Sequence, residues 1–277
     1  MRFNSCARVR FTLVAAVALM TACAGANSPA TSSRRLDADQ PPPSMDTLVT
    51  TEWLNQHLDD PDLVVLDCTV RMEPDEGGGM RAVSGRADYE AGHIPSAGFA
   101  DLMIDLSDGD SAFKFALPTP EQFCAAMGAL GVGDDSRVVL YDASMSAWAA
   151  RVWWMLRWVG FDRAALLDGG LRAWTAEGRP LSSEPTRRPA KRLTPALRPE
   201  LIATRDEVLS AIGSGGLCII DALPESHYRG EMTLYGRPGH IPGALNLPVF
   251  ALLDESGRYR SYDELAALHD CDRRARA

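Results

Sequence analysis

The chain of 277 residues is poor in the side chains that build metal centres, because it contains only five histidines and six cysteines. The cysteines stand at positions 6, 23, 68, 124, 218 and 271, and none of them forms a Cys-x-x-Cys pair. No cluster of histidines accompanies them, so we do not expect a zinc site. Six cysteines in a chain of this length also do not indicate a disulfide framework.

Positive charge is scarce as well. Lys and Arg number 28 against 37 Asp and Glu, which gives a net charge of -9. A nucleic-acid partner needs a clustered basic face, so none is expected. The one arginine-rich run, residues 187–192, lies among prolines and indicates a solvated linker. The hydrophobic share of 46% is that of a globular chain, and the length suggests two domains of roughly 150 residues each.

A long apolar run is missing at the N-terminus. The run Phe11–Met20 has ten residues and is too short to span a bilayer. Three arginines precede it, at positions 2, 8 and 10, and small residues follow it. A positive segment, a short apolar core and a small-residue end are typical of a signal peptide, which we place at residues 1–23.

The residues before Cys23 resemble a bacterial lipobox, which predicts a lipid-modified N-terminus at Cys23 and a membrane anchor. Residues 24–46 are rich in Pro and Ser and are expected to form a flexible tether. This interpretation places the protein in the bacterial cell envelope, either lipid-anchored or periplasmic. The alternative is that Met45 is the true first residue and that the protein is cytoplasmic.

Three motifs occur twice along the chain, in the same order. Each copy has an apolar stretch that ends in Asp, then a Gly-His-Ile-Pro turn, then the start of an amphipathic helix. The pairs are Val64–Asp67 with Cys218–Asp221, Gly92–Ala97 with Gly239–Ala244, and Thr119–Phe123 with Ser261–Leu265. The second copies follow the first by about 142 to 154 positions, which indicates an internal duplication.

Each copy begins with a short helix whose expected N-cap is a threonine, Thr51 in the first and Thr204 in the second. Apolar strands then alternate with amphipathic helices, such as the strand Val138–Tyr141 and the helix Ala147–Val159. Such alternation predicts an α/β fold with a parallel sheet flanked by helices. The expected boundaries are a first domain at residues 47–178, a linker at 179–199 and a second domain at 200–277.

Three stretches of the first copy resemble the two-domain rhodanese family, the thiosulfate and 3-mercaptopyruvate sulfurtransferases. They are Tyr89–Pro95, Arg151–Arg157 and Leu167–Trp174, and the resemblance extends from about Leu48 to His269. It implies two tandem rhodanese-like domains, each a parallel sheet flanked by helices. It also implies sulfane sulfur transfer from a small anionic donor to a thiol or cyanide through a cysteine persulfide, without metal or cofactor.

The family's nucleophile is a cysteine that opens a tight loop between a strand and a helix, where loop N–H groups favour an anionic sulfur. In the first copy this position is held by Asp142, which cannot carry a persulfide. The resemblance therefore implies a non-catalytic first domain that packs against the second. Ser144 and Ser146 in the same loop suggest a hydrolase only weakly, because no matching base is evident.

The duplication places the second loop near position 284, beyond Ala277, so we expect a second domain that is truncated before its catalytic cysteine. No other cysteine has the required setting. We expect Cys68 to be a buried core thiol, Cys218 to lie in a core strand, Cys124 to lie on a helix, and Cys271 to lie in a tail with no strand–loop–helix frame.

Catalytic second domains of this family carry two arginines after the strand-ending acid that hold the anionic donor. Leu223 and His227 stand at those positions here. His227, Arg229 and Arg237 are the candidate donor-binding residues, because the two arginines are near enough to compensate in part. The sequence thus leaves two interpretations: a sulfurtransferase by descent that is inactive as this chain, and a non-catalytic rhodanese-fold binding module tethered at the envelope.

Overall fold

A computed structural model describes residues 45–76, 80–214, 218–232 and 237–268. The predicted signal peptide at 1–23, the predicted lipidation site Cys23, nearly all of the expected tether and Cys271 lie outside the described residues. No helix among the described residues is long and apolar enough to cross a membrane.

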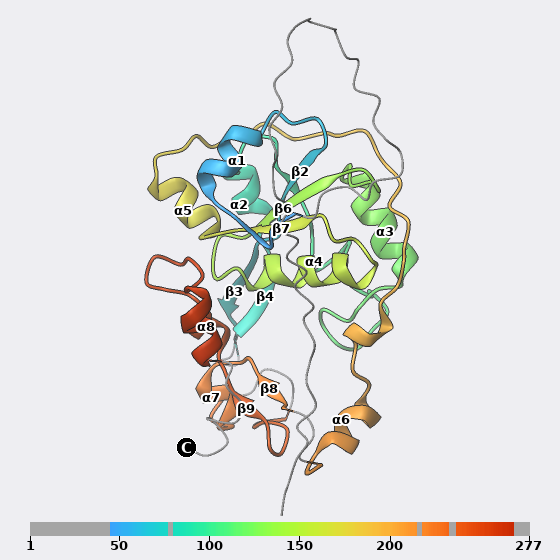
Figure 1. The fold of residues 1–277 in the computed structure, drawn as a ribbon, viewed down its shortest axis with the longest axis vertical. Coiled ribbons are helices and arrows are strands. Elements are labelled where there is room, and N and C mark those ends of the chain that lie inside the picture. Colours follow the sequence, from blue (N-terminus) through green and yellow to red (C-terminus); the bar gives the residue numbers. More distant parts are fainter. Residues whose placement is uncertain (1–44, 77–79, 215–217, 233–236, 269–277) are drawn as a thin grey trace, which may run out of the picture. The chain divides into compact units, whose positions relative to one another are not determined.

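A five-stranded parallel sheet forms the centre of the first domain, with strand order β1-β7-β6-β2-β5 (Figure 1). The strands are β1 (Leu48–Val49), β2 (Leu63–Asp67), β5 (Gly98–Phe99), β6 (Arg137–Tyr141) and β7 (Ala164–Leu167). Every neighbouring pair runs parallel, as the alternation of strands and helices predicted. The two edge strands, β1 and β5, are only two residues long.

Strand β2 is buried on both faces, and its alternating side chains serve two separate cores. Val64 and Leu66 pack with the helices α3 (Pro120–Ala129) and α4 (Ala147–Trp158). Leu63 and Val65 belong to the other core, with side chains from α1 (Thr51–His57), α2 (Arg86–Ala91) and α5 (Gly170–Ala176). Figure 1 shows α1, α2 and α5 grouped together, apart from α3 and α4.

An antiparallel hairpin, β3 (Val70–Pro74) and β4 (Met80–Ser84), follows β2 and was not predicted from the sequence. The N-cap of α1 is Thr50, whose hydroxyl accepts a hydrogen bond from the Trp53 amide at 3.0 Å. The predicted cap, Thr51, was therefore wrong by one residue. The Thr51 hydroxyl instead donates to the carboxylate of Glu177 at 2.7 to 2.8 Å.

Most residues of the segment 179–199 are exposed, as the prediction of a solvated linker requires, but several of them contact the first domain. The amide of Lys191 donates to the carbonyl of Gly128 at 3.0 Å, and the amide of Thr194 donates to Asp134 Oδ1 at 2.7 Å. Leu193 is 5% exposed and belongs to the core beneath α3 and α4. Backbone hydrogen bonds, ion pairs to Asp135 and Asp162 and one buried apolar side chain thus join this polar segment to the first domain.

The described part of the second domain repeats elements of the first, and three of them, the counterparts of β2, α2 and α3, are shorter. The elements of this part are η1 (Pro199–Leu201), α6 (Arg205–Ala211), β8 (Ile220–Asp221), α7 (Glu225–Tyr228), β9 (Leu245–Asn246), η2 (Val249–Leu252) and α8 (Tyr262–Leu268). Strands β8 and β9 pair in parallel, and Asp221 faces Asn246 just as Asp67 faces Phe99 in the first domain. The predicted cap Thr204 is confirmed, since it forms a reciprocal capping box with Glu207.

A stacked tyrosine–histidine pair supports the Gly-His-Ile-Pro turn in both copies. In the first domain the rings of Tyr89 and His93 stack at 4.0 Å, and His93 Nδ1 lies 2.7 Å from the Tyr89 carbonyl oxygen. The Tyr89 hydroxyl donates to the carbonyl of Ala97 at 2.7 Å. Tyr228 and His240 repeat this arrangement in the second domain. Both histidines are thus held by local structure.

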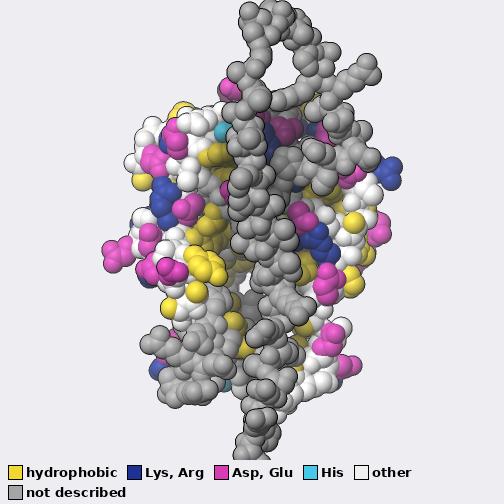
Figure 2. Space-filling model, viewed as in Figure 1, with side chains coloured by type: hydrophobic (Ala, Val, Ile, Leu, Met, Phe, Trp, Pro, Cys, Tyr) yellow, Lys and Arg dark blue, Asp and Glu magenta, His cyan; other side chains and the backbone are white. Residues whose placement is uncertain are grey.

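The buried apolar side chains are concentrated in the first domain. Beyond residue 200, those that are buried are Ala211, Ala244, Leu247 and Leu253. Large apolar side chains there are exposed, including Leu209 at 52% and Phe250 at 50%. On the face drawn in Figure 2, acidic side chains are spread over the described surface, with Lys and Arg in small groups among them.

This distribution predicts unequal resistance to proteolysis. Regions with few buried apolar contacts open locally at low free energy, so thermolysin should cut residues 200–268 at least about tenfold faster than residues 45–198. Mass spectrometry of a native digest time course measures the two rates. The urea-unfolded chain is the control, in which both regions should be cut at similar rates. First cuts within 45–198 would contradict the prediction.

Candidate functional site: the loop after β6

The loop between β6 and α4 lies at the carboxyl end of the central strands, where parallel sheets bind their ligands. Asp142 directly follows Tyr141, the last residue of β6, and α4 begins at Ala147. Asp142 is 2% exposed. The position that the family resemblance assigned to the nucleophile is thus occupied by a buried carboxylate.

Five donors converge on this carboxylate. Its Oδ1 accepts hydrogen bonds from the amides of Ser144 and Ser146 at 2.9 and 3.0 Å, and from the Ser144 hydroxyl at 3.3 Å. Its Oδ2 accepts from the amides of Trp148 and Ala149, in the first turn of α4, at 3.1 Å each. We call these four N–H groups and one hydroxyl the Asp142 cradle. Such a convergence of N–H groups at a helix N-terminus favours an anion.

Two neighbouring segments fix the loop in place. The carbonyl oxygen of Asp142 accepts a hydrogen bond from the Leu171 amide at 3.1 Å. A Cβ at Gly170, whose φ is +54°, would lie 2.5 Å from that carbonyl oxygen, so this position requires glycine. On the other side, the Ala143 amide donates to the Thr69 hydroxyl at 3.1 Å.

Cys68 is a buried thiol beside this loop, as predicted. It is fully buried, and its amide donates to the Tyr141 carbonyl at 2.8 Å. Burial raises the pKa of its thiol well above the ordinary value, and the charges of Asp67 and Asp142 raise it further. A thiolate is the form that attacks sulfur, so Cys68 does not have the setting of a nucleophile.

The other described cysteines also lack the surroundings of a nucleophile. Cys124 lies on α3, as predicted, and is 5% exposed; burial raises its pKa to about 11. The prediction that Cys218 lies in a core strand was wrong, because it is exposed and precedes β8. Cys218 is therefore at the amino end of that strand, whereas the family's nucleophile loop follows the carboxyl end of a strand. Among the described residues no cysteine occupies a strand–loop–helix cradle.

A turn of the second domain contacts the loop that follows β7, and we call residues 254–260 the docking turn. The amide of Tyr259 donates to Asp168 Oδ1 at 2.8 Å. The guanidinium of Arg258 donates to the Asp168 carbonyl at 3.2 Å and to Glu177 Oε1 at 2.6 Å. These contacts could not be predicted from local sequence patterns, since they join residues about 80 to 90 positions apart.

The side chain of Tyr259 packs against the core beneath α3 and α4. Burial and, to a smaller extent, the charges of Asp142 and Asp168 raise the pKa of Tyr259 to about 12. Tyr259 is therefore a neutral phenol at physiological pH.

The three donor-binding candidates lie on or after α7, and no hydrogen bond or ion pair among the described residues joins them. His227 is half-buried, and its Nδ1 has no partner in the described part of the chain. Arg229 is exposed and pairs with Glu225 one helical turn earlier. Arg237 is exposed. Leu223, at a position where the family has arginine, donates its amide to Asp221 Oδ1 at 2.9 Å.

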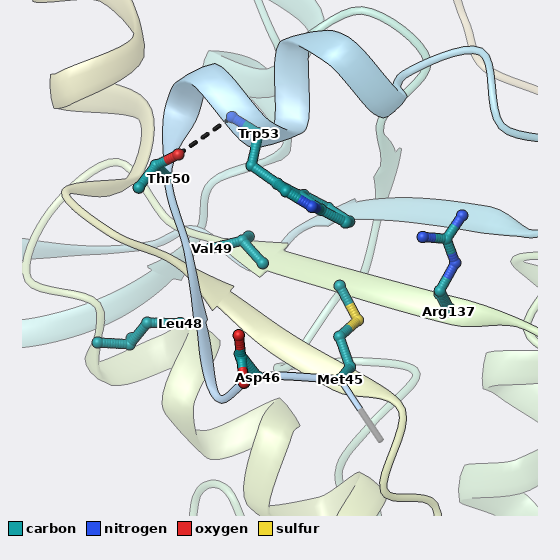
Figure 3. A pocket seen from close by; sticks show the side chains of 7 residues that line it. All are labelled: Met45, Asp46, Leu48, Val49, Thr50, Trp53 and Arg137. Carbon is teal, nitrogen blue, oxygen red and sulfur yellow. Dashed lines mark hydrogen bonds between the residues drawn. The ribbon is translucent and has the colours of Figure 1, made fainter. Parts of the chain in front are cut away.

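A cavity of about 430 Å³ lies elsewhere, beside the edge strand β1 (Figure 3). Figure 3 shows the side chains of Trp53, Met45 and Arg137 around it, and the Arg137 guanidinium lies 5.8 Å from the Trp53 ring. Arg137 opens β6 while Asp142 follows its end. This cavity is therefore at the opposite end of the strand from the Asp142 cradle and takes no part in that site.

Comparisons with known proteins agree with this geometry. The family model for the rhodanese-like domain matches residues 50–177. The 3-mercaptopyruvate sulfurtransferase of Escherichia coli is 35% identical over 224 residues, which cover 79% of this chain and 77% of the relative. The thiosulfate sulfurtransferase of Gallus gallus is 34% identical over 184 residues, 65% of this chain and 63% of the relative. The sulfur carrier protein TtuD of Thermus thermophilus is 34% identical, over 81% and 77%.

The crystal structure of SseA, a 3-mercaptopyruvate sulfurtransferase from Escherichia coli, superposes with a TM-score of 0.72 at 35% sequence identity. The match covers 80% of this chain and 82% of that one, and so includes both domains. Sequence, fold and the position of the loop after β6 lead to one assignment: the chain belongs to the two-domain rhodanese family of sulfurtransferases.

Proposed function

We propose that this chain derives from an enzyme of sulfane sulfur transfer, that its first domain is non-catalytic, and that its described cysteines transfer no sulfur. The related proteins named above include 3-mercaptopyruvate and thiosulfate sulfurtransferases, which supports an anionic sulfur donor of that class. The donors and acceptors are small molecules, and the chemistry needs no cofactor.

The observation that carries the proposal is the buried carboxylate of Asp142 at the nucleophile position. In thiosulfate chemistry a cysteine thiolate attacks the outer sulfur, a new S–S bond forms, and sulfite leaves with the electron pair of the broken bond. Asp142 has no sulfur to receive that bond, and its charge repels an anionic donor. The first domain then has a structural role, since the Asp142 carboxylate occupies the loop after β6 and the docking turn binds Asp168 in the loop after β7.

A second candidate is a non-catalytic binding module of the rhodanese fold. Leu223 and His227 favour it, because they stand where catalytic second domains carry two arginines that hold the donor. Arg229 and Arg237 are the remaining cations near α7, and we propose that they and His227 form the anion-binding group. Two lost cation–anion contacts reduce affinity for a small anion strongly when the contacts are desolvated.

We also propose a location in the bacterial cell envelope, either lipid-anchored through Cys23 or periplasmic. The basic segment before Phe11, the ten-residue apolar run and the small residues before Cys23 support it. A start at Met45 would instead give a cytoplasmic protein, and the two forms differ at the N-terminus that a purified protein carries.

The first prediction concerns activity. The purified chain should produce no thiocyanate from thiosulfate and cyanide above the protein-free rate, because the thiols of Cys68 and Cys124 are buried and protonated and Cys218 is disulfide-bonded. The thiosulfate sulfurtransferase of Gallus gallus measured in parallel is the positive control. Turnover that is present in the wild type and lost in the C68S variant would overturn the proposal.

The second prediction concerns donor binding. If the group near α7 binds anions, the R237Q variant should bind thiosulfate about five- to tenfold more weakly than the wild type, as measured by calorimetry at low salt. The matched control is R205Q, which removes one exposed arginine from α6. Equal affinity of R237Q and the wild type would exclude Arg237 from the group.

The third prediction concerns the envelope anchor. Full-length protein produced in a bacterium should incorporate an alkyne-tagged fatty acid and fractionate with membranes, whereas the C23S variant should do neither. The C6S variant, altered within the proposed signal peptide, is the matched control and should keep the label. A soluble, unlabelled protein whose N-terminal sequence starts at Met45 would instead establish the cytoplasmic alternative.

A further inference from the structure

We propose that a cavity of about 500 Å³ in the first domain, lined by α2, β5 and the segment around Pro185, binds a small primary ammonium compound. The groups that recognise it are the second nitrogen of the His93 ring, the carboxylates of Glu90 and Asp105, and an apolar floor. None of the cavity residues belongs to the loop after β6, so the inference does not rest on sulfur transfer by the chain.

The His93 ring lines the cavity and carries a buried acceptor. The residue is 1% exposed, and its Nδ1 lies 2.7 Å from the Tyr89 carbonyl oxygen. Because a carbonyl oxygen can only accept, Nδ1 carries the proton, and Nε2 of the neutral ring is an acceptor. No described residue donates to Nε2. Buried polar atoms normally have a partner, and a ligand that donates an N–H group from the cavity would satisfy this one.

The segment 179–199 screens this ring from bulk water. The His93 amide donates to the Ser182 carbonyl at 2.9 Å, and the Ser182 amide donates back to the His93 carbonyl at 2.8 Å. Pro185, a few residues further along, lines the cavity. His240, the counterpart in the second domain, has the same stacked tyrosine but is exposed. A spare imidazole nitrogen in a closed pocket is therefore a property of the first copy.

Two carboxylates on the cavity wall, those of Glu90 and Asp105, form no ion pair or hydrogen bond with a described residue. The nearby carboxylate of Asp101 is almost fully buried. Partial burial raises the pKa of Asp105, and the charge of Asp101 raises it further. A bound cation relieves this repulsion. Among the described residues no group of three His, Cys, Asp or Glu side chains could hold a metal ion, which favours an organic cation.

Arg86 also lines the cavity and on its own would favour an anion. Its guanidinium lies 3.8 Å from Asp101 Oδ2 and 4.8 Å from the centre of the Phe99 ring. The charge of Arg86 is thus already engaged by a buried carboxylate and an aromatic face, whereas the two acids on the wall are unpaired. The rings of Tyr89 and Phe99 and the side chain of Leu130 give an apolar floor for a short alkyl chain.

The experiment titrates the full chain with butylammonium chloride at low salt and follows the nitrogen resonance of His93 Nε2 by NMR. Binding should move this resonance in a saturable manner, because an ammonium N–H donates to the Nε2 lone pair. Tetramethylammonium has the same charge but no N–H group, and it should bind at least about tenfold more weakly at equal ionic strength. Butyrate tests the anionic alternative and should also bind more weakly than butylammonium.

Variants of the cavity wall form the second arm. E90Q and D105N should each bind butylammonium at least about fivefold more weakly than the wild type, because each removes one carboxylate and keeps the shape of the side chain. The matched control is D110N, which alters an exposed acid outside the cavity and should bind as the wild type does. An Nε2 resonance that butylammonium leaves unchanged would mean that water alone occupies the cavity and would refute the proposal. Equally tight binding of tetramethylammonium or butyrate, or wild-type affinity in E90Q or D105N, would refute it as well.

Discussion

The hydrogen bonds between the Asp142 carboxylate and the amino end of α4 are the constraint on which the described site depends. A helix N-terminus and a tight loop leave backbone amides that need hydrogen-bond acceptors. A buried amide without an acceptor costs about 1 to 3 kcal/mol of free energy. In a catalytic rhodanese loop these amides stabilise an anionic sulfur. Here the chain supplies its own anion, at 2% exposure, and the loop is complete without a ligand. The Asp142 carboxylate thus accepts the hydrogen bonds that the loop would otherwise offer to an anionic sulfur.

The fold was predictable because its determinants are local or repeated. The apolar stretches around Val64 and Val138, the Gly-His-Ile-Pro turns and the Thr204 cap each follow from short-range patterns, and all are found where they were expected. The cap of α1 was misplaced because Thr50 and Thr51 are adjacent and both can cap. Their roles differ only through Glu177, which is 126 positions from Thr51. The hairpin β3–β4 was missed although the Asp and Gly residues between its strands are a turn signal, because its two five-residue strands contain several polar residues.

The candidate site was predictable in part. The role of the Asp142 position followed from the resemblance to the family's strand–loop–helix, and the burial of Cys68 could be expected from the apolar strand before it. The exposure of Cys218 could not, because an apolar sequence next to an Asp does not reveal how much of a sheet covers it. Tyr259 and Arg258 could not be found either, since their partners on the first domain are distant in sequence and their own neighbours resemble an ordinary turn. Family membership therefore establishes the fold, while the function of this chain depends on a few side chains at its loops.

The short edge strands of the first domain have a consequence for its behaviour in concentrated solution. The described sheet ends on both sides in strands of two residues, β1 and β5. An edge of that length presents very few unpaired backbone groups, so a neighbouring molecule finds almost nothing on which to add a strand. The domain is thereby protected from intermolecular sheet growth by geometry and not by charge. It should stay monodisperse in high salt, where a protein that relied on its net charge of -9 would lose its protection.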